Sequence, residues 1–169
     1  VVENNIKALN ICNSKGLKAF NNLDAIPSHS KFRIITFWHS LEHIINLNTT
    51  LARTSLLLEK EGYVIIALPN INSFDSKYYK GKWAALDVPR HLWHFTRKGI
   101  ELLLKENNFI LIKSYPLFMD AFYISYLSEK QNGSYFPLFK GIILGIISNI
   151  KALFSKEYSS IIYIFKKRS

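Results

Sequence analysis

The sequence predicts an α/β protein with a mostly parallel sheet flanked by helices. Short apolar runs rich in β-branched and aromatic residues alternate with stretches whose apolar residues recur at helical spacing. The predicted strands are residues 32–38, 62–68, 109–115 and 160–165. Because these runs are apolar almost without interruption, we expect buried strands in a parallel-rich sheet that helices cover on both faces.

Three helices are predicted before and between the first three strands. They are residues 5–15, residues 47–60 up to a stop near Gly62, and the stretch between Thr96 and Asn107–Asn108. Gly16 suits a C-terminal cap of the first helix, and the Thr96 hydroxyl suits an N-terminal cap of the third. Residues 117–133 show no clear period, so they are expected to be irregular.

A strongly apolar helix is predicted at residues 140–156. Its apolar stripe consists of Ile142, Ile143, Ile146, Ile147, Ile150, Leu153 and Phe154, with Lys140, Lys151 and Lys156 mostly opposite. The unbroken apolar run, 141–147, is far shorter than the ~20 residues of a membrane span. We expect this helix to dock on the sheet or to cover the site, within a lid or insert region at about 116–158. Its lysines leave peripheral membrane contact through 140–156 as an alternative.

Length and composition indicate one domain over residues 1–169. The single Cys12 excludes an internal disulfide and a cysteine zinc site, and it suits a reducing cytoplasm. The first residues do not form a signal-peptide pattern, so a cytoplasmic location is expected. The 22 basic and 12 acidic residues give a formal net charge of +10, which attracts anionic partners of many kinds. A non-catalytic basic module for a membrane surface or nucleic acid is therefore an alternative, although no nucleic-acid motif accompanies the charge and we expect no nucleic-acid partner.

Two stretches carry the residues that indicate chemistry. Residues 37–43 read FWHSLEH and follow directly after a predicted strand, and residues 87–96 read DVPRHLWHFT. Histidines, an arginine and carboxylates that lie among aromatic residues are typical of a partly buried small-molecule site. In a parallel sheet, ligands bind at the carboxyl ends of strands, where His39 and the Pro69–Asn70 pair are predicted to lie.

The letters His39-Ser-Leu-Glu42-His43 also match the HxxEH pattern of zinc hydrolases. That chemistry needs both histidines on one helix face. Here His39 directly follows a predicted strand, so the two histidines are expected to straddle a junction between strand and loop. A zinc hydrolase is therefore only a minor alternative, and no metal site is expected.

Both stretches, and their order, resemble class I S-adenosylmethionine-dependent methyltransferases, in particular a bacterial branch with LEH and PRHL-aromatic-HF motifs. The resemblance implies a Rossmann-like fold, with S-adenosylmethionine as cofactor and a small-molecule methyl acceptor. The family's first central strand and its glycine-rich turn would precede Val1, since no G-x-G pattern occurs in the chain. We therefore expect a domain that lacks this strand and that, alone, is poorly folded or binds the cofactor very weakly.

The resemblance also implies roles for individual residues. Glu3 would accept hydrogen bonds from the cofactor ribose, Asn22 and Leu23 would lie at the adenine, and Trp38 and His39 would line the cofactor pocket. His91 or His94 would take a proton from the acceptor, as O-methylation requires. Arg90 can clamp a carboxylate or phosphate, and Trp93 and Phe95 can form an apolar wall, so we expect a small or lipid-linked anionic acceptor. In the structural alternative, residues 87–96 only hold a lid onto the helix after Thr96.

Overall fold

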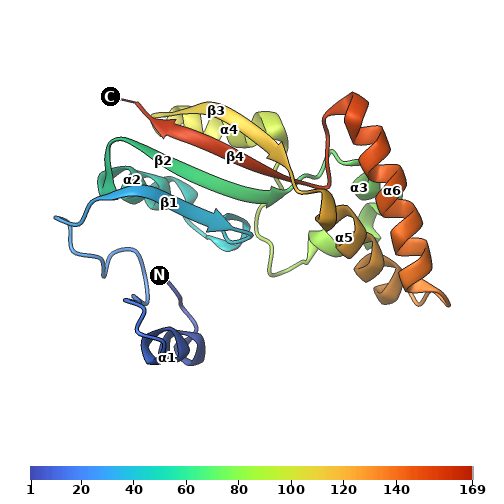
Figure 1. Ribbon diagram of the computed structural model, residues 1–169, viewed down its shortest axis with the longest axis horizontal. Coiled ribbons are helices and arrows are strands. Elements are labelled where there is room, and N and C mark those ends of the chain that lie inside the picture. Colours follow the sequence, from blue (N-terminus) through green and yellow to red (C-terminus); the bar gives the residue numbers. More distant parts are fainter. Residues whose placement is uncertain (169) are drawn as a thin grey trace.

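The computed structural model describes residues 1–168 (Figure 1). The strands are β1 (Phe32–Trp38), β2 (Leu58–Pro69), β3 (Phe109–Pro116) and β4 (Ser160–Lys167). The α-helices are α1 (Ile6–Ser14), α2 (Leu47–Leu57), α3 (Phe74–Tyr79), α4 (Arg97–Glu106), α5 (Phe118–Gln131) and α6 (Pro137–Ser155). Short 3₁₀ turns are η1 (Leu41–His43), η2 (Lys80–Lys82) and η3 (Ala84–Leu86). The α/β fold class is confirmed.

The sheet has four strands in the order β1-β2-β4-β3. β1 and β2 pair in parallel, whereas β4 lies between β2 and β3 and runs antiparallel to both. β1, β2 and β3 therefore point the same way, and β4 alone is reversed. The sheet is therefore mixed, with three of its four strands parallel in direction, and β4 separates β3 from β2 because it returns between them after α5 and α6.

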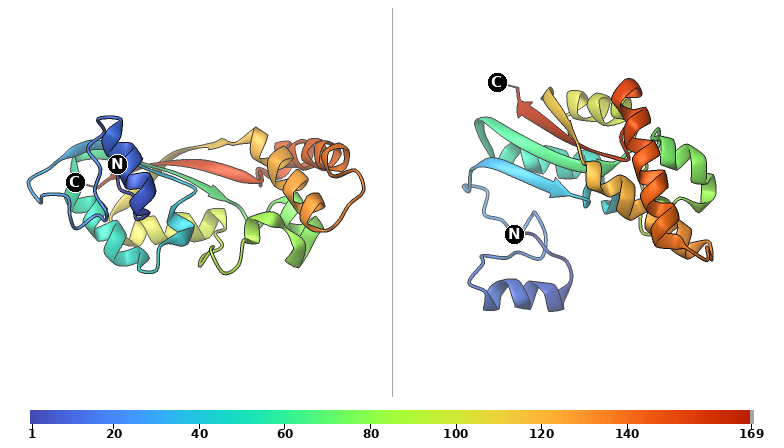
Figure 2. Two further views of the ribbon diagram at one scale, coloured as in Figure 1. Left: turned by 90° about the horizontal axis from the view of Figure 1, so that it is seen from below. Right: turned by 45° about the vertical axis from the view of Figure 1, so that its right-hand side comes forward.

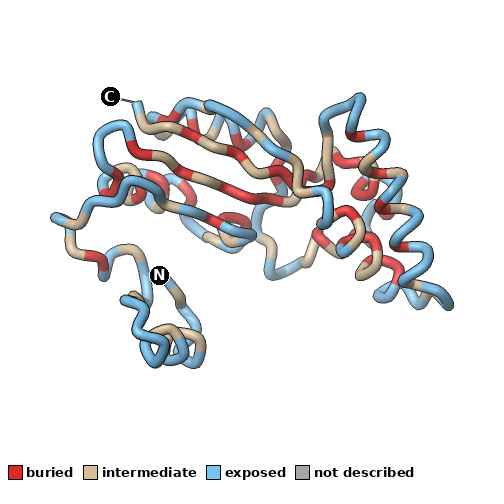
Figure 3. Tube along the Cα trace, viewed as in Figure 1, coloured by how far each residue is buried: buried red, intermediate tan, exposed pale blue. Residues whose placement is uncertain are grey.

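Helices cover one face of this sheet. α2 and α4 lie on the same side in both views of Figure 2. The core between them and the sheet contains Leu51, Val64, Ile66, Ile100 and Phe165, and Figure 3 shows the buried positions alternating along β2 and β4. Most side chains on the opposite face are half-buried or exposed, including Ile34 and Ile112, although Ala67 of β2 is buried. The prediction that helices cover both faces is wrong for residues 1–168.

β1 was predicted to be a buried strand, and this was also wrong. It forms an edge of the sheet, and Phe37 is its one buried residue. Ile34 and Trp38 are exposed, at 51% and 52% of their surface. β1 therefore carries more apolar side-chain surface than its neighbours among residues 1–168 cover.

The N-terminal residues form a small unit of their own. Val2 and Phe20 make an isolated parallel bridge, and α1 connects them. The Asn5 side chain caps α1, and Gly16 follows it with φ of +74°, as its predicted capping role requires. Figure 1 shows this unit next to the β1 side of the sheet and away from α5 and α6.

α5 and α6 form an antiparallel pair at the end of the sheet to which β1 and β2 point (Figure 1). Residues 118–131 were predicted to be irregular, but they are the helix α5. Its buried face carries Ala121, Ser125 and Ser128 as well as Ile124, so the sequence shows only a weak apolar period. A periodic apolar stripe is not required where small residues let two helices approach closely.

α6 packs on α5 through small residues rather than through its isoleucine stripe. Its buried residues are Gly141, Gly145, Ser148 and Ala152. A Cβ at Gly141 would lie 2.6 Å from Tyr126 Cα, so only glycine permits this approach. The predicted stripe faces largely outward, with Ile146 and Ile150 about half exposed. The prediction that this stripe docks on the sheet was wrong.

By length and composition, α6 is also apolar enough to cross a membrane. It has 19 residues and a mean hydropathy of 1.5, and 22% of its apolar window is buried in the protein. The short run 141–147 had suggested otherwise, because it leaves out the apolar residues at both ends of the helix. One such helix is weak evidence of a membrane span, and one face of α6 already packs on α5.

Candidate functional site

The two stretches that the sequence singled out lie side by side. The Glu42 carbonyl accepts a hydrogen bond from the Leu92 N–H at 2.9 Å and a weaker one from the Trp93 N–H at 3.3 Å. The Trp93 indole N–H donates to the Ile44 carbonyl at 2.7 Å. η1 begins three residues after β1, so these contacts hold residues 87–96 at the carboxyl end of that strand. This is where ligands bind in α/β sheets.

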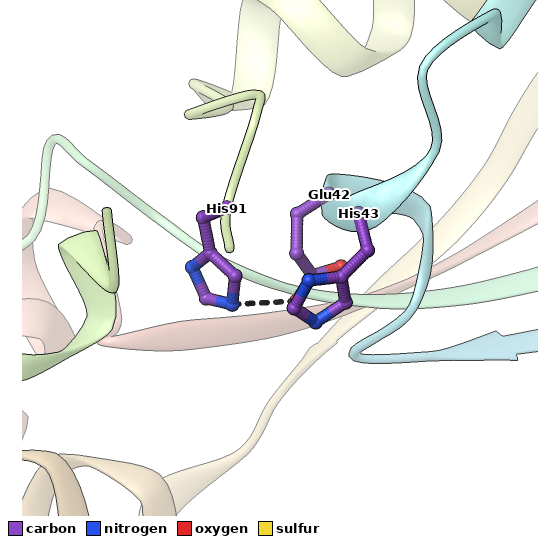
Figure 4. Close-up of side chains that lie close together, drawn as sticks. All are labelled: Glu42, His43 and His91. Atoms are coloured by element: carbon purple, nitrogen blue, oxygen red, sulfur yellow. Dashed lines mark ion pairs between the residues drawn. The ribbon is translucent and has the colours of Figure 1, made fainter. Parts of the chain in front are cut away.

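Glu42, His43 and His91 converge at this junction (Figure 4). One carboxylate oxygen and one nitrogen of each ring all lie within 4.8 Å of one another. The Glu42 side chain is 1% exposed, and neither of its carboxylate oxygens has a hydrogen-bond partner in residues 1–168. A buried carboxylate without such partners is costly unless a positive charge compensates it.

Backbone carbonyls fix both of these histidine rings. His43 Nδ1 lies 2.9 Å from the Arg90 carbonyl, and His91 Nδ1 lies 2.8 Å from the Ala85 carbonyl. A carbonyl oxygen only accepts, so each Nδ1 must carry the proton. In the neutral rings, Nε2 of both histidines is then left with a free lone pair.

His39 occupies a different position. It directly follows β1 and has a φ of +43°. Its Nε2 lies 3.2 Å from Asp120 of α5, and its Nδ1 lies 3.6 Å from Glu42. Asp120 first, and then Glu42, raise the pKa of His39 to about 9 against the effect of partial burial. His39 is therefore positively charged at neutral pH, and it connects the end of β1 to α5.

A small pocket opens beside this junction. It is lined by Pro69, Ile71, Trp83, Ala85, His91, Trp93, His94 and Phe95. The parallel bridge between Asn70 and Phe95 holds the end of β2 against the segment before α4. Four residues predicted as catalytic or substrate-binding therefore share one pocket: His91, Trp93, His94 and Phe95. Their roles stay predictions.

Arg90 lies outside this pocket. Its side chain is largely exposed, and its Nε and Nη2 donate to Asp87 at 3.1 and 2.6 Å. Only its backbone carbonyl reaches the junction, where it orients His43. The predicted clamp on an anionic substrate would require the Arg90 side chain to leave Asp87.

The residues predicted to hold the cofactor fall into two groups. Glu3 and Asn22 follow Val2 and Phe20, the residues of the isolated parallel bridge, and therefore lie at neighbouring strand ends. Glu3 accepts from the Asn5 N–H and Asn22 from the Ala25 N–H, both at 2.8 Å.

Leu23, the third residue of the first group, accepts a long hydrogen bond of 3.4 Å from Arg53 of α2 through its carbonyl. Trp38 and His39 form the second group, at the end of β1, where the Trp38 side chain is exposed. Glu3, Asn22 and Leu23 therefore lie just after the isolated bridge, and Trp38 and His39 lie at the carboxyl end of β1.

Sequence reasoning missed a buried polar cluster around Asp75. This carboxylate is fully buried and accepts hydrogen bonds from Trp83 Nε1, Ser148 Oγ and Ser159 Oγ at 2.6 to 2.8 Å. It thus joins α3 to α6 and to the segment before β4. Trp83 also lines the pocket, so Asp75 supports the pocket wall. The only signal in the sequence was an acid in the segment 74–79, which also contains three aromatic residues.

The chain is similar to known methyltransferases in sequence and in fold. A family model described as a methyltransferase domain matches residues 6–114, which include both stretches of the site. No curated protein gives a significant sequence match.

Among solved structures, a SAM-dependent methyltransferase from Thermotoga maritima is 13% identical, with a TM-score of 0.64 over 99% of this chain and 72% of that one. A type 11 methyltransferase from Sulfolobus solfataricus is also 13% identical, with a TM-score of 0.57 over 99% and 69%. A protein from Galdieria sulphuraria assigned as a sarcosine dimethylglycine methyltransferase is 13% identical, with a TM-score of 0.55 over 94% and 64%. At these identities the likeness shows the fold, and the chain spans less than two thirds of the last protein's length.

Proposed function

Because the chain belongs to the methyltransferase domain family, whose class I members use S-adenosylmethionine, we propose that it methylates an oxygen atom of a small or lipid-linked anionic molecule. The observation that carries this proposal is the contact between residues 42–44 and residues 90–93, which builds a histidine- and aromatic-lined pocket at a strand end. Such a pocket can orient an acceptor hydroxyl and remove its proton, and these are the main tasks of a protein in methyl transfer.

The residues at the strand ends fit the cofactor. A carboxylate at Glu3 next to the Asn22 turn offers acceptors for a ribose and an adenine, and the exposed Trp38 ring offers an apolar wall. When bound there, S-adenosylmethionine supplies an electrophilic methyl group. Glu3, Asn22, Leu23, Trp38 and His39 would hold it, and the charged His39 would remain paired with Asp120.

His91 and His94 are the two candidates for the general base. His91 Nδ1 is held by the Ala85 carbonyl, and His94 Nε2 lies 2.9 Å from the Leu86 carbonyl. In the neutral rings, the lone pair is therefore on Nε2 of His91 and on Nδ1 of His94. Both side chains line the pocket, and either lone pair can accept a hydroxyl proton near neutral pH. An anionic acceptor is favoured by the basic residues between Lys77 and Lys98.

Calorimetry with S-adenosylhomocysteine and the full-length protein tests the proposal. Glu3→Ala should weaken binding by about 1.5–3 kcal/mol, because charge-assisted hydrogen bonds are lost. His94→Ala or His91→Ala should lower turnover by roughly a hundredfold or more with little change in that binding. Absence of binding at any reachable concentration would refute the enzyme proposal and favour a non-catalytic basic module.

We further propose that the exposed face of α6 contacts an anionic membrane surface peripherally, from the cytoplasmic side. Leu138, Phe139, Ile142, Ile146, Ile150, Leu153 and Phe154 are exposed, and Lys140, Lys151 and Lys156 are exposed beside them. Apolar side chains flanked by lysines are typical of helices that lie in a membrane interface. This surface would also bring a lipid-linked acceptor to the end of the sheet where the site lies.

Co-sedimentation with phosphatidylglycerol vesicles tests this contact. Wild-type protein should pellet, whereas a variant with Glu at positions 140, 151 and 156 should remain in solution. Neutral phosphatidylcholine vesicles provide the control for charge. If both proteins pelleted equally with the anionic vesicles, charge-driven contact would be ruled out.

A further inference from the structure

We propose that Glu42, His43 and His91 bind a divalent transition-metal ion. The three residues come from the η1 turn and from the segment before α4, and their ligand atoms lie within 4.8 Å of one another (Figure 4). Two imidazoles and one carboxylate form a donor set that zinc, iron, cobalt and manganese ions accept in proteins. This set differs from the HxxEH pattern, because His39 points to Asp120 and His91 takes its place.

The orientation of the two rings supports metal binding. In metal sites, the histidine nitrogen that does not bind the ion usually donates its hydrogen to a carbonyl or a carboxylate. Here Nδ1 of His43 donates to the Arg90 carbonyl and Nδ1 of His91 to the Ala85 carbonyl. These hydrogen bonds fix the tautomers and leave both Nε2 atoms as donors for a metal ion.

The buried carboxylate of Glu42 supports metal binding independently of the histidine rings. It is 1% exposed, and both of its oxygens lack hydrogen-bond partners in the described part of the chain. The nearest side-chain nitrogens are His39 Nδ1 at 3.6 Å and His91 Nε2 at 3.9 Å, both beyond ordinary hydrogen-bond length. The charged His39 compensates part of the buried Glu42 charge, and an ion between Glu42 and His91 would compensate the rest and coordinate the oxygens directly. Nothing else within residues 1–168 hydrogen-bonds these oxygens.

The spacing is close to that of a formed site. Two ligands at about 2.1 Å from a tetrahedral ion are about 3.4 Å apart. Glu42 Oε1 and His91 Nε2 are 3.9 Å apart, and the ligand atoms of all three residues lie within 4.8 Å of one another, so the side chains would have to close by up to about 1.4 Å to bind an ion. Three protein ligands also leave a coordination position open, as in catalytic rather than structural metal sites.

The open position suggests a role that rests on the proposed methyl transfer. His91 lines the pocket, so an acceptor hydroxyl there could bind the ion and lose its proton more readily. The proton would pass to Nδ1 of His94, the oxygen would form a bond to the methyl carbon, and the carbon–sulfur bond would break. His91 would then be a metal ligand, and His94 would be the base.

Titration of the chelator-treated full-length protein with ZnCl2 and with CoCl2 tests the binding itself, without reference to activity. We expect about one ion per chain, and a visible Co²⁺ absorption band typical of a coordination number below six. Glu42→Gln and His91→Gln should each weaken binding by more than about 100-fold, since even changes behind the ligands cost about 10–100-fold. His29→Gln is the matched control, because His29 is an exposed histidine outside the two segments that form the site. The metal affinity of this variant should equal that of wild type.

His43→Gln keeps the test decisive if the buried Glu42 cannot be replaced without unfolding, because His43 is exposed. No binding by wild-type protein, or binding by the His43→Gln and His91→Gln variants that is as tight as in wild type, would overturn the proposal. Methyl-transfer assays with and without chelator separate the two hypotheses. Metal binding without methyl transfer would leave the site intact and refute the proposed function, whereas chelator-insensitive transfer would refute the catalytic role of the ion.

Discussion

The indole N–H of Trp93 donates to the Ile44 carbonyl at 2.7 Å, across 49 residues of sequence. This bond joins the segment before α4 to the turn after β1, and so it helps to hold the site together. Trp93→Phe keeps most of the ring but removes the donor and leaves a carbonyl unpaired. We expect a loss of about 1 kcal/mol in the free energy of unfolding, measured with urea. Trp38→Phe, at an exposed tryptophan, should change it by less than about 0.5 kcal/mol.

Truncation of the Asp75 side chain should destabilise the fold much more than loss of its charge alone. Asp75→Ala would leave the indole of Trp83 and the hydroxyls of Ser148 and Ser159 without their buried acceptor. We expect a loss of roughly 3 kcal/mol or more in urea unfolding. Asp75→Asn keeps one acceptor oxygen and the volume, and a serine hydroxyl can reverse its role, so its loss should be clearly smaller. Equal losses in the two variants would show that the hydrogen bonds contribute little.

Gly141 permits the close approach of α6 to α5. In Gly141→Ala the added Cβ would meet the Tyr126 backbone at 2.6 Å, which cannot rotate away as a side chain could. We expect a destabilisation of about 1–3 kcal/mol, measured by thermal or urea unfolding. Gly81→Ala is the matched control, because nothing lies within 4 Å of a Cβ at that position. A similar effect of both substitutions would indicate that the helices can separate freely.

Alkaline pH should destabilise the fold through Tyr163. Its side chain is 2% exposed, and burial raises its pKa above the ordinary value of 10.0. The folded state therefore keeps the phenol proton to a higher pH than the unfolded chain does. Stability from this group is complete below pH 10 and declines above it, by up to about 1.4 kcal/mol per pH unit. Tyr163→Phe should show a shallower decline between pH 10 and 11 in urea unfolding, and identical slopes would contradict this assignment.

Local features of the fold could be predicted because nearest neighbours encode them. The strand at 32–38 and the helix after Thr96 lie where expected, and the Thr96 hydroxyl accepts from the Gly99 N–H at 3.0 Å. The helix predicted to reach residue 60 instead ends at Leu57, and β2 begins at Leu58. Glu61, with φ of +66°, lies where the β1–β2 register shifts, so Gly62 lies inside a strand rather than at a helix end.

The rest depended on contacts between distant residues. The sequence singled out Glu42, His43 and His91 separately, but His91 joins the other two only because backbone hydrogen bonds connect the two segments. The isoleucine stripe correctly predicted the helix α6 but wrongly predicted which face of that helix is buried. The buried face carries Gly141 and Ser148, which pack more closely against α5 than isoleucines would. Asp75 gave almost no signal, because its three partners lie in three different segments.

The position of β4 also has a consequence for how the chain acquires its sheet during synthesis. β2 and β3 do not pair with each other, because β4 lies between them. Until Ser160–Lys167 has left the ribosome, β3 has no strand to pair with, and β2 has only β1 on one side. Translation must therefore proceed through α5 and α6 before β4 can form its hydrogen bonds with β2 and β3. During that interval the apolar edges of β2 and β3 are unpaired, and unpaired strand edges favour aggregation unless chaperones bind them or folding is fast.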